Sequence, residues 1–441
     1  MSQHQRIFFW SITAALGGFL FGFDTAVISG VEQSLQSLWN LNAWEHGLTV
    51  SIALIGTVLG SMLGGIPAEK LGRKITLFWI AVLYLVASVG SALATNWELF
   101  LVFRFLGGLG VGASSVAAPM YITEISPAKS RGRLVGLFQF NVVLGILIAY
   151  LSNYLLQGVS ADSWRWMLGV QAFPSLLFLI AVLNIPESPR WLLLVKGQVA
   201  EASTVLNMID PDTAEETLLA LQQHARGQQK AARLFSSQYS TPVMLAVLFA
   251  VFNQVSGINA IIYYAPRIFE MTGLGKSSAL LSSAGIGLVN LIFTMISMNL
   301  IDRFGRRTLM KIGSVGLIVT LALVARAFYV EDFSGLTVPL LLFGYIAFFG
   351  FSQGAVIWVF ISEIFPNEVR SSGQALGSFT HWLMAAIITF TFPYLAEHIG
   401  GGNTFLFFTI MMVLQLLFVI RLMPETKGTS LEGIEKIVVL H

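Results

Sequence analysis

The sequence contains no cysteine, and charged residues make up only 11% of its 441 positions. Without cysteine the chain has neither a disulfide framework nor a thiolate metal site. Because 55% of the residues are hydrophobic, a soluble protein of this length could not solvate its surface. The formal net charge of +2 gives no indication of nucleic-acid binding. These features leave a membrane protein as the class to consider.

Long apolar runs recur along nearly the whole chain, and the mean hydropathy is +0.76. A bilayer core of about 30 Å needs roughly 20 helical residues, and helices satisfy their own backbone groups in lipid. The first run is too long for a cleaved signal peptide and contains an acidic residue, so it is kept as a helix. The sequence predicts an all-α membrane protein with twelve transmembrane helices near residues 8–30, 46–68, 75–94, 98–122, 133–157, 165–185, 241–266, 277–301, 308–330, 337–362, 371–397 and 403–423.

One long polar stretch separates the first six spans from the last six. The predicted organisation is an N-terminal six-helix half at 1–196, cytoplasmic linker helices at 197–240, a C-terminal six-helix half at 241–423 and a cytoplasmic tail at 424–441. Most Lys and Arg residues fall on one side if both termini are cytoplasmic, as the positive-inside rule requires. The absence of any Asn-x-Ser/Thr sequon and the short outer loops favour a bacterial inner membrane.

Two local patterns occur once in each half. Glu69–Lys74 (EKLGRK) resembles Asp302–Arg307 (DRFGRR), and Tyr121–Pro127 (YITEISP) resembles Ile361–Pro366 (ISEIFP). Both recur at nearly the same distance along the chain, which indicates duplicated halves. A duplicated bundle suits transport by alternating access around a central site. An ion channel is the competing interpretation, but no filter-like loop or ring-forming acidic segment is present.

Several further segments carry a family resemblance that runs from about Gly17 to Gly428. They are Gly22–Gly30 (GFDTAVISG), Arg104–Gly112 (RFLGGLGVG), Pro119–Glu124 (PMYITE), Pro186–Leu192 (PESPRWL), Gln254–Asn259 (QVSGIN), Ser362–Pro366 (SEIFP) and Pro424–Gly428 (PETKG). In this order they resemble the sugar porter family of the major facilitator superfamily. The resemblance implies the major facilitator fold, a monosaccharide cargo (hexose or pentose) and a protein that is not an enzyme.

Motifs for cofactor or metal chemistry are not found. Gly275–Ser277 is not part of a phosphate loop, because Glu270 stands where such a loop needs glycine. The six histidines form no His-Glu-x-x-His arrangement. We therefore expect no cofactor and no metal, and no nucleic acid among the partners. The expected partners are the sugar, protons and the lipid bilayer, with the chain acting as a monomer.

Side-chain amides inside apolar spans are the candidate sugar ligands, because an amide both donates and accepts hydrogen bonds and is costly to bury alone. Aromatic rings would cover the apolar face of the sugar. On positions that match the family pattern, the expected substrate-binding residues are Gln139, Asn253, Gln254, Asn259, Asn290, Trp358 and Trp382, with Tyr263 and Tyr264 as an outer gate. The alternative for each amide is an interhelical hydrogen bond that only holds the bundle.

Two charges lie deep in the first half, Asp24 in the first span and Arg104 in the fourth. An intramembrane charge is functional by default and usually paired, so the pair is the predicted proton-coupling site, with a permanent structural pair as the alternative. The cytoplasmic charges that match the family's inner salt-bridge network are Glu69, Arg73, Glu124, Arg131, Glu187, Asp302, Arg306, Glu363 and Arg370. They are the expected inner gate, unless they only form the cytoplasmic charge excess.

The chain departs from the family pattern at a few positions. Asn253 replaces a glutamine, and Ala355 replaces a proline, which removes a built-in break from the tenth span. A facilitative uniporter of the same fold, or a transporter-like nutrient sensor, remains an alternative to a proton symporter. A sensor would carry a long signalling tail, and few residues follow the last predicted span.

Overall fold

The computed structural model describes residues 3–127, 130–226, 233–333, 335–366 and 368–427. Within these ranges every regular element is helical, and twelve stretches are long and apolar enough to cross a bilayer. The predicted all-α fold with twelve spans is confirmed, with limits a few residues from those predicted. The spans are Gln3–Gly30, Ala43–Lys70, Arg73–Leu93, Trp97–Glu124, Arg131–Leu156, Ser163–Leu183, Ser237–Met271, Lys276–Phe304, Arg306–Tyr329, Thr337–Glu363, Arg370–His398 and Gly400–Arg421.

The helices form two compact units. The first contains the chain as far as Val27, residues Ile55–Ala149 and the helices between Gly158 and Arg226, including those of the polar stretch. The second contains Ile28–Leu54, Tyr150–Gln157 and the helices that follow Arg226. Two segments within the predicted N-terminal half at 1–196 therefore belong to the second unit. The predicted limits of the two halves stay a prediction. Residues 227–232 of the predicted linker and 428–441 of the predicted tail lie outside the described residues.

In the first unit, helix α5 is central. It packs against α6, α8 and α9, and α1 packs against α6 and α9. Aromatic side chains such as Tyr84, Tyr121 and Phe178 fill the core between these helices. The elements of this unit are α1 (Gln3–Val27), part of α3 (Ala43–Leu63), α4 (Gly65–Lys70), α5 (Arg73–Leu93), α6 (Trp97–Glu124), most of α7 (Arg131–Leu156), α8 (Ser163–Gly169), α9 (Ala172–Leu183), α10 (Pro189–Leu194), α11 (Val199–Ile209) and α12 (Ala214–Arg226).

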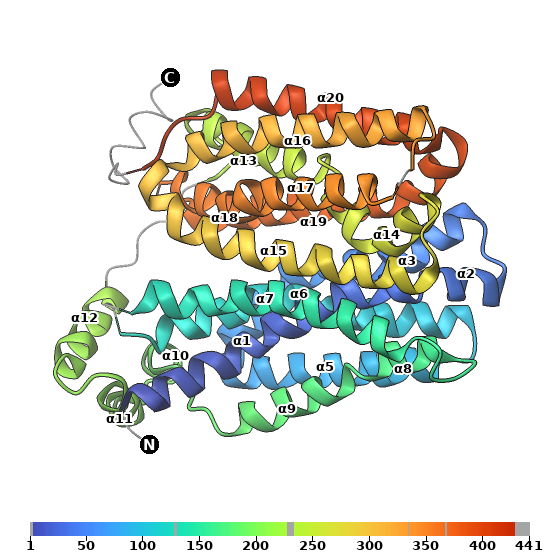
Figure 1. The fold of residues 1–441 in the computed structure, drawn as a ribbon. Coiled ribbons are helices and arrows are strands. Elements are labelled where there is room, and N and C mark those ends of the chain that lie inside the picture. The colour runs from blue at the N-terminus through green and yellow to red at the C-terminus, as the bar shows by residue number, and fades with distance from the viewer. Residues whose placement is uncertain (1–2, 128–129, 227–232, 334, 367, 428–441) are drawn as a thin grey trace. The chain divides into compact units, whose positions relative to one another are not determined.

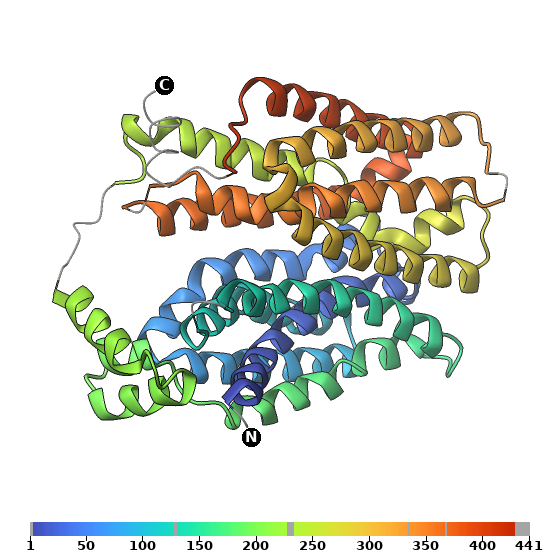
Figure 2. The same ribbon diagram turned by 60° about the vertical axis from the view of Figure 1, so that its left-hand side comes forward.

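In the second unit, α16 runs alongside α20 and α17 (Figure 1), an arrangement also visible in the turned view (Figure 2). Helix α13 packs on α19, and α15 packs on α17. The elements are η1 (Ile28–Gly30), α2 (Glu32–Trp39), the start of α3, the end of α7, η2 (Ser237–Tyr239), α13 (Ser240–Gln254), α14 (Ile258–Met271), α15 (Lys276–Phe304), α16 (Arg306–Tyr329), α17 (Thr337–Phe351), α18 (Gln353–Glu363), α19 (Arg370–His398) and α20 (Gly400–Arg421).

The seventh span is broken between α13 and α14. Gly257 has a left-handed backbone with φ of 86°, and a Cβ there would meet the Phe408 ring at 2.6 Å, so only glycine fits. The hydroxyl of Ser256 donates to the Asn253 carbonyl at 2.6 Å, and the Tyr345 hydroxyl donates to the Ser256 carbonyl at 2.9 Å. Side chains thus bond carbonyls near the break, as buried backbone groups require.

The tenth span is also broken, although Ala355 stands where the family pattern has a proline. The break lies at Ser352, between α17 and α18, where ψ of −88° is not helical. The Ser352 N–H bonds both the Phe348 and Phe349 carbonyls, and its hydroxyl also donates to Phe348 at 2.6 Å. The Ser352 hydroxyl thus bonds a helix carbonyl at the break, as a serine that competes with the backbone does.

Candidate functional site

A cluster of buried amides lies at the break of the seventh span, with Gln254 at its centre. The Gln254 Nε2 donates to Asn253 Oδ1 at 2.8 Å, and the Gln254 Oε1 accepts from Asn259 Nδ2 at 2.6 Å. All three side chains are less than a tenth exposed. The structure therefore brings together three of the predicted sugar ligands, which are linked by hydrogen bonds to one another. A polar ligand that enters must exchange these bonds for its own.

Aromatic rings lie beside the amide cluster. The His381 ring is 3.3 Å from Gln254 Nε2 through either of its nitrogens, and its centroid is 4.8 Å from that of Trp358. The Trp358 and Trp382 centroids are 6.5 Å apart. The predicted tryptophans therefore lie together, joined by a histidine that the list of expected ligands left out. Its position next to Trp382 in the sequence is the signal that could have added it.

Two other predicted ligands lie apart from this hydrogen-bonded cluster. Asn290, on α15, accepts a hydrogen bond from Thr294 at 3.3 Å. Gln139 lies on α7 in the first unit and is partly exposed. Gln353 was missed although it meets the same criterion of an amide inside an apolar span. It is 1% exposed, and its Oε1 bonds none of the described residues.

The two predicted gate tyrosines follow in the same broken span. Tyr263 and Tyr264 are 2% and 0% exposed. The Tyr264 hydroxyl donates to the Thr389 carbonyl at 3.1 Å, and its ring packs on Phe392 with centroids 5.0 Å apart. Tyr264 itself departs from helical geometry (φ −120°, ψ 19°), two residues before Pro266. This part of α14 is therefore kinked where it meets α19.

The predicted coupling residues form a buried ion pair in the first unit. Arg104 Nη1 lies 2.6 Å from Asp24 Oδ1, and Arg104 Nη2 donates to the Asp24 carbonyl at 3.2 Å. Their side chains are only 2% and 4% exposed. Gly107 lies beside the pair, where an added Cβ would be 3.7 Å from Asp24 Oδ1, an ordinary van der Waals distance. If the two side chains of such a pair separate while still buried, each is left as an uncompensated charge, which destabilises the protein.

One charged cluster surrounds the start of α5. Arg73 forms a bidentate pair with Glu124, with both bonds at 2.9 Å, and Ser188 also donates to Glu124. Glu187 accepts from the backbone N–H of Arg73 at 2.9 Å and of Lys74 at 3.1 Å. The carboxylate therefore caps a helix N-terminus, where backbone donors and the helix dipole favour negative charge.

Burial of the Glu187 carboxyl raises its pKa above the usual range, although backbone N–H groups from Ser188, Lys74 and Arg73 and the Arg73 charge lower it. Burial disfavours the ionised form, and here it outweighs the donors. For an acid whose pKa is raised in the folded state, the stabilising contribution is present at low pH and is lost as pH rises through that pKa. Ionisation of Glu187 thus costs stability even while its carboxylate caps α5.

The second unit repeats this arrangement at the start of α16. Arg306 pairs with Glu363 at 2.7 Å and with Asp302 at 2.9 Å, while Thr426 donates to Glu363. Glu425 accepts from the backbone N–H of Arg306 and Arg307, both at 3.0 Å. Glu425 was not among the predicted gate residues. The signal was present, because Pro424-Glu-Thr matches Pro186-Glu-Ser, whose glutamate was predicted.

We expect Glu425→Ala to lower the thermal unfolding temperature. The change removes acceptors for the first N–H groups of α16 and leaves Arg306 with fewer counter-charges, a loss of about 1 kcal/mol for a helix cap. Thermal unfolding of the purified protein is the measurement, with Glu397→Ala, an exposed acid near the end of α19, as the control. Equal effects of the two changes would contradict the capping role.

Three predicted inner-gate residues lie outside these clusters of strong bonds. Glu69 and Arg131 are exposed; the backbone carbonyl of Glu69, and not its carboxylate, accepts from Trp191 at 2.7 Å. Arg370 donates to the Phe365 carbonyl at 3.2 Å. The structure thus brings together Arg73, Glu124 and Glu187 in one unit and Asp302, Arg306 and Glu363 in the other.

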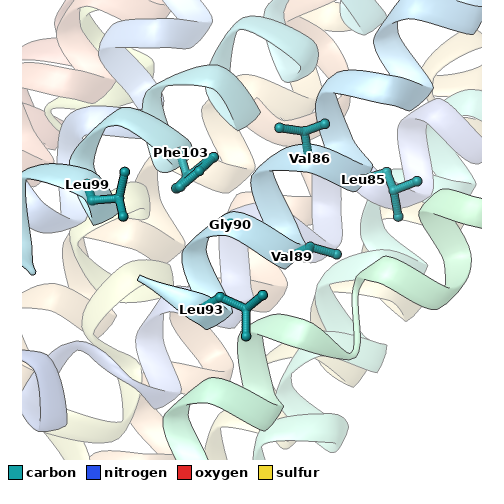
Figure 3. A pocket seen from close by; sticks show the side chains of 7 residues that line it. All are labelled: Leu85, Val86, Val89, Gly90, Leu93, Leu99 and Phe103. Atoms are coloured by element: carbon teal, nitrogen blue, oxygen red, sulfur yellow. The ribbon is translucent and has the colours of Figure 1, made fainter. Parts of the chain in front are cut away.

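An apolar hollow of about 510 Å³ lies on the first unit (Figure 3). Its lining comes from α5 and α6, where a Cβ on Gly90 would meet the Phe103 ring at 2.2 Å. The seven lining residues are Leu85, Val86, Val89, Gly90, Leu93, Leu99 and Phe103. None has a polar side chain, so the hollow lacks the side-chain hydrogen-bonding groups that sugar recognition needs.

Twelve spans, paired charge clusters at corresponding helix starts and a buried amide cluster at a broken helix define an integral membrane transporter. Comparison with known proteins identifies the family. The family described as "Sugar (and other) transporter" matches residues 10–438, and the chain belongs to it. The predicted resemblance is confirmed, as are the fold and the expectation of a transporter that is not an enzyme.

Named relatives match over nearly the full length. The chain is 37% identical over 437 residues to the arabinose-proton symporter of Bacillus subtilis (strain 168), covering 97% of this chain and 94% of the relative. It is 35% identical over 476 residues to the D-xylose-proton symporter of Escherichia coli (strain K12), covering 98% and 96%. The inward open structure of the E. coli xylose transporter XylE matches with a TM-score of 0.88 at 33% identity, covering 98% of this chain and 100% of that one.

Proposed function

We propose that this chain carries a monosaccharide across a bacterial inner membrane by alternating access, coupled to proton movement. The observation that carries the proposal is the buried cluster of Gln254, Asn253 and Asn259 beside Trp358 and Trp382. Amides that now bond one another can exchange those bonds for sugar hydroxyls, and indole rings can cover the apolar ring face. Gln139 and Asn290 complete the proposed substrate-binding set.

Proton coupling is assigned to Asp24 and Arg104. A carboxylate held by a guanidinium in a nearly water-free site stays charged only while its partner is close. If the two separate during the transport cycle, Asp24 takes up a proton, and when they approach again it releases one. The names of the arabinose and xylose relatives, both proton symporters, support this coupling.

The gates follow from the same cycle. Tyr263 and Tyr264 act as the outer gate. The two charge clusters act as the inner gate on the cytoplasmic side, together with Glu69, Arg131 and Arg370. Ion pairs that contribute a few kcal/mol are enough to set the population of one state. Both termini are proposed to be cytoplasmic, and the functional form a monomer in the lipid bilayer.

Uptake into proteoliposomes tests the proposal. Labelled pentoses and hexoses are supplied with and without an inward proton gradient. For one proton per sugar, a gradient of one pH unit supports an accumulation of about tenfold. Accumulation that collapses with a protonophore is the expected result. Uptake that only reaches the outside concentration would make the protein a facilitator, and no uptake of any monosaccharide would overturn the proposal.

A further inference from the structure

A second buried ion cluster lies in the second unit, away from the amide cluster. His46 Nε2, on α3, is 2.7 Å from Glu32 Oε2, on α2. Arg267 Nε, on α14, is 3.7 Å from the other carboxylate oxygen, Glu32 Oε1. Arg267 also donates to Gln36 Oε1, one turn further along α2. One carboxylate is therefore shared by an imidazole and a guanidinium from two other helices.

The burial of this cluster sets it apart from a surface ion pair. The side chains of Glu32 and His46 are fully buried, and that of Arg267 is 26% exposed. Exposed pairs contribute little, whereas a buried carboxylate that loses its partner leaves an uncompensated charge. Moving any one of these three helices away from the others would therefore leave the Glu32 carboxylate without its partners, which costs free energy.

The local backbone turns α2 and α3 back on one another so that the acid and the imidazole meet. Asn40 adopts a left-handed conformation at the end of α2 (φ 51°). Asn42 Oδ1 then accepts from the backbone N–H of Trp44 and Glu45, both at 3.0 Å, and caps α3. His46 follows within the first turn of α3.

The third partner, Arg267, comes directly after the kink of α14. It follows Pro266, and Tyr264 is the residue with non-helical geometry. The His46 ring lies 6.0 Å from the Tyr264 ring. The N-terminal part of α3 also approaches α19 closely, since a Cβ on Gly47 would come within 2.1 Å of the Phe390 carbonyl oxygen. The ion cluster therefore joins the segment 28–54 to the kinked part of α14, beside the proposed outer gate.

We propose that Glu32, His46 and Arg267 form an ionic lock that keeps the outer gate closed, and that the transport cycle must break it. The inference rests on the proposed alternating access. In the closed state Arg267 neutralises the Glu32 carboxylate, and the His46 imidazole lies against its other oxygen. When the gate opens, all three groups become hydrated, so the lock releases without leaving a buried charge.

The absence of native cysteine allows a direct test by spin labelling. Cysteines replace Leu38 near the end of α2 and Met271 at the end of α14, which are 49% and 41% exposed and lie outside the lock. Pulsed electron paramagnetic resonance gives the distance distribution in lipid nanodiscs without sugar. We expect Arg267→Gln to raise the ratio of long to short distances at least about tenfold, because it leaves Glu32 charged and buried.

A double-mutant cycle identifies the coupling. Adding Glu32→Gln to Arg267→Gln removes the uncompensated charge, so the double variant should move back toward the wild-type distribution. Glu45→Gln is the matched control, because Glu45 precedes His46 directly, yet its carboxylate accepts from the Asn42 N–H at 2.9 Å and forms no ion pair with the described residues. This change should leave the distance distribution unchanged. An unchanged Arg267→Gln distribution, or strictly additive effects, would overturn the lock. Since no cargo is present, this result is independent of whether the protein carries a sugar.

Discussion

Asp24→Asn should abolish accumulation of sugar against a gradient while leaving sugar exchange intact. Asparagine keeps an oxygen that can accept from Arg104 but cannot take up or release a proton, so it imitates the protonated acid. Linkage requires that a proton which drives sugar binding is itself bound more tightly when sugar is present. Removing the titratable group removes that linkage. The expected accumulation ratio falls from about tenfold per pH unit to one.

The measurement for Asp24 is paired. Counterflow without a proton gradient reports exchange, and uptake with a gradient reports coupling. Asp162→Asn is the control, because Asp162 also pairs with an arginine but its side chain is 66% exposed. If Asp24→Asn concentrates sugar as the wild type does, the proton is carried elsewhere and the 2.6 Å pair with Arg104 is structural.

Gln254→Ala should cause the largest loss of sugar affinity of any single amide change. Gln254 bonds both Asn253 and Asn259 and touches His381, so its removal leaves sugar hydroxyls and two protein amides short of partners. An unmade hydrogen bond in a buried site costs roughly 1 to 3 kcal/mol. The dissociation constant should therefore rise about ten- to a hundredfold or more.

Calorimetric titration of the purified variant is the measurement for Gln254. Gln415→Ala is a matched control, since Gln415 is a fully buried amide that bonds Ser314 at 2.8 Å, far along the chain in α20. Both changes should lower the unfolding temperature, but only Gln254→Ala should weaken binding. Equal affinities in the two variants would assign Gln254 to interhelical packing.

The spans were predictable because a bilayer imposes one length and one chemistry on every helix that crosses it. The pairing of Asp24 with Arg104 followed for a similar reason, since two isolated charges in apolar spans need each other. By contrast, the break at Ser352 depends on a hydroxyl that competes for helix carbonyls, and a serine gives no such signal in the sequence. Hydropathy cannot distinguish it from a serine that bonds within an intact helix.

The lock formed by Glu32, His46 and Arg267 could not be predicted from the sequence for a different reason. Glu32 and His46 flank a short connection, where charges are expected to face water, and Arg267 lies more than two hundred residues later at the end of a span. Only the packing of α2, α3 and α14 buries Glu32 and His46 and brings Arg267 beside them. Glu425 is a different case: its segment carries the family resemblance, and its match to Pro186-Glu-Ser, whose Glu187 is a predicted gate residue, is the signal in the sequence.

The cap at α16 also bears on how the protein can be engineered. Glu425 and Thr426 come after the last span, yet they bond Arg306, Arg307 and Glu363, and Lys427 donates to the Arg303 carbonyl at 2.6 Å. A truncation that stops at Arg421 would keep every span and still remove the Glu425 carboxylate that caps the N-terminus of α16. Affinity tags and fluorescent fusions therefore belong after Lys427, and a shortened chain should retain Pro424–Lys427 as an integral part of its second unit.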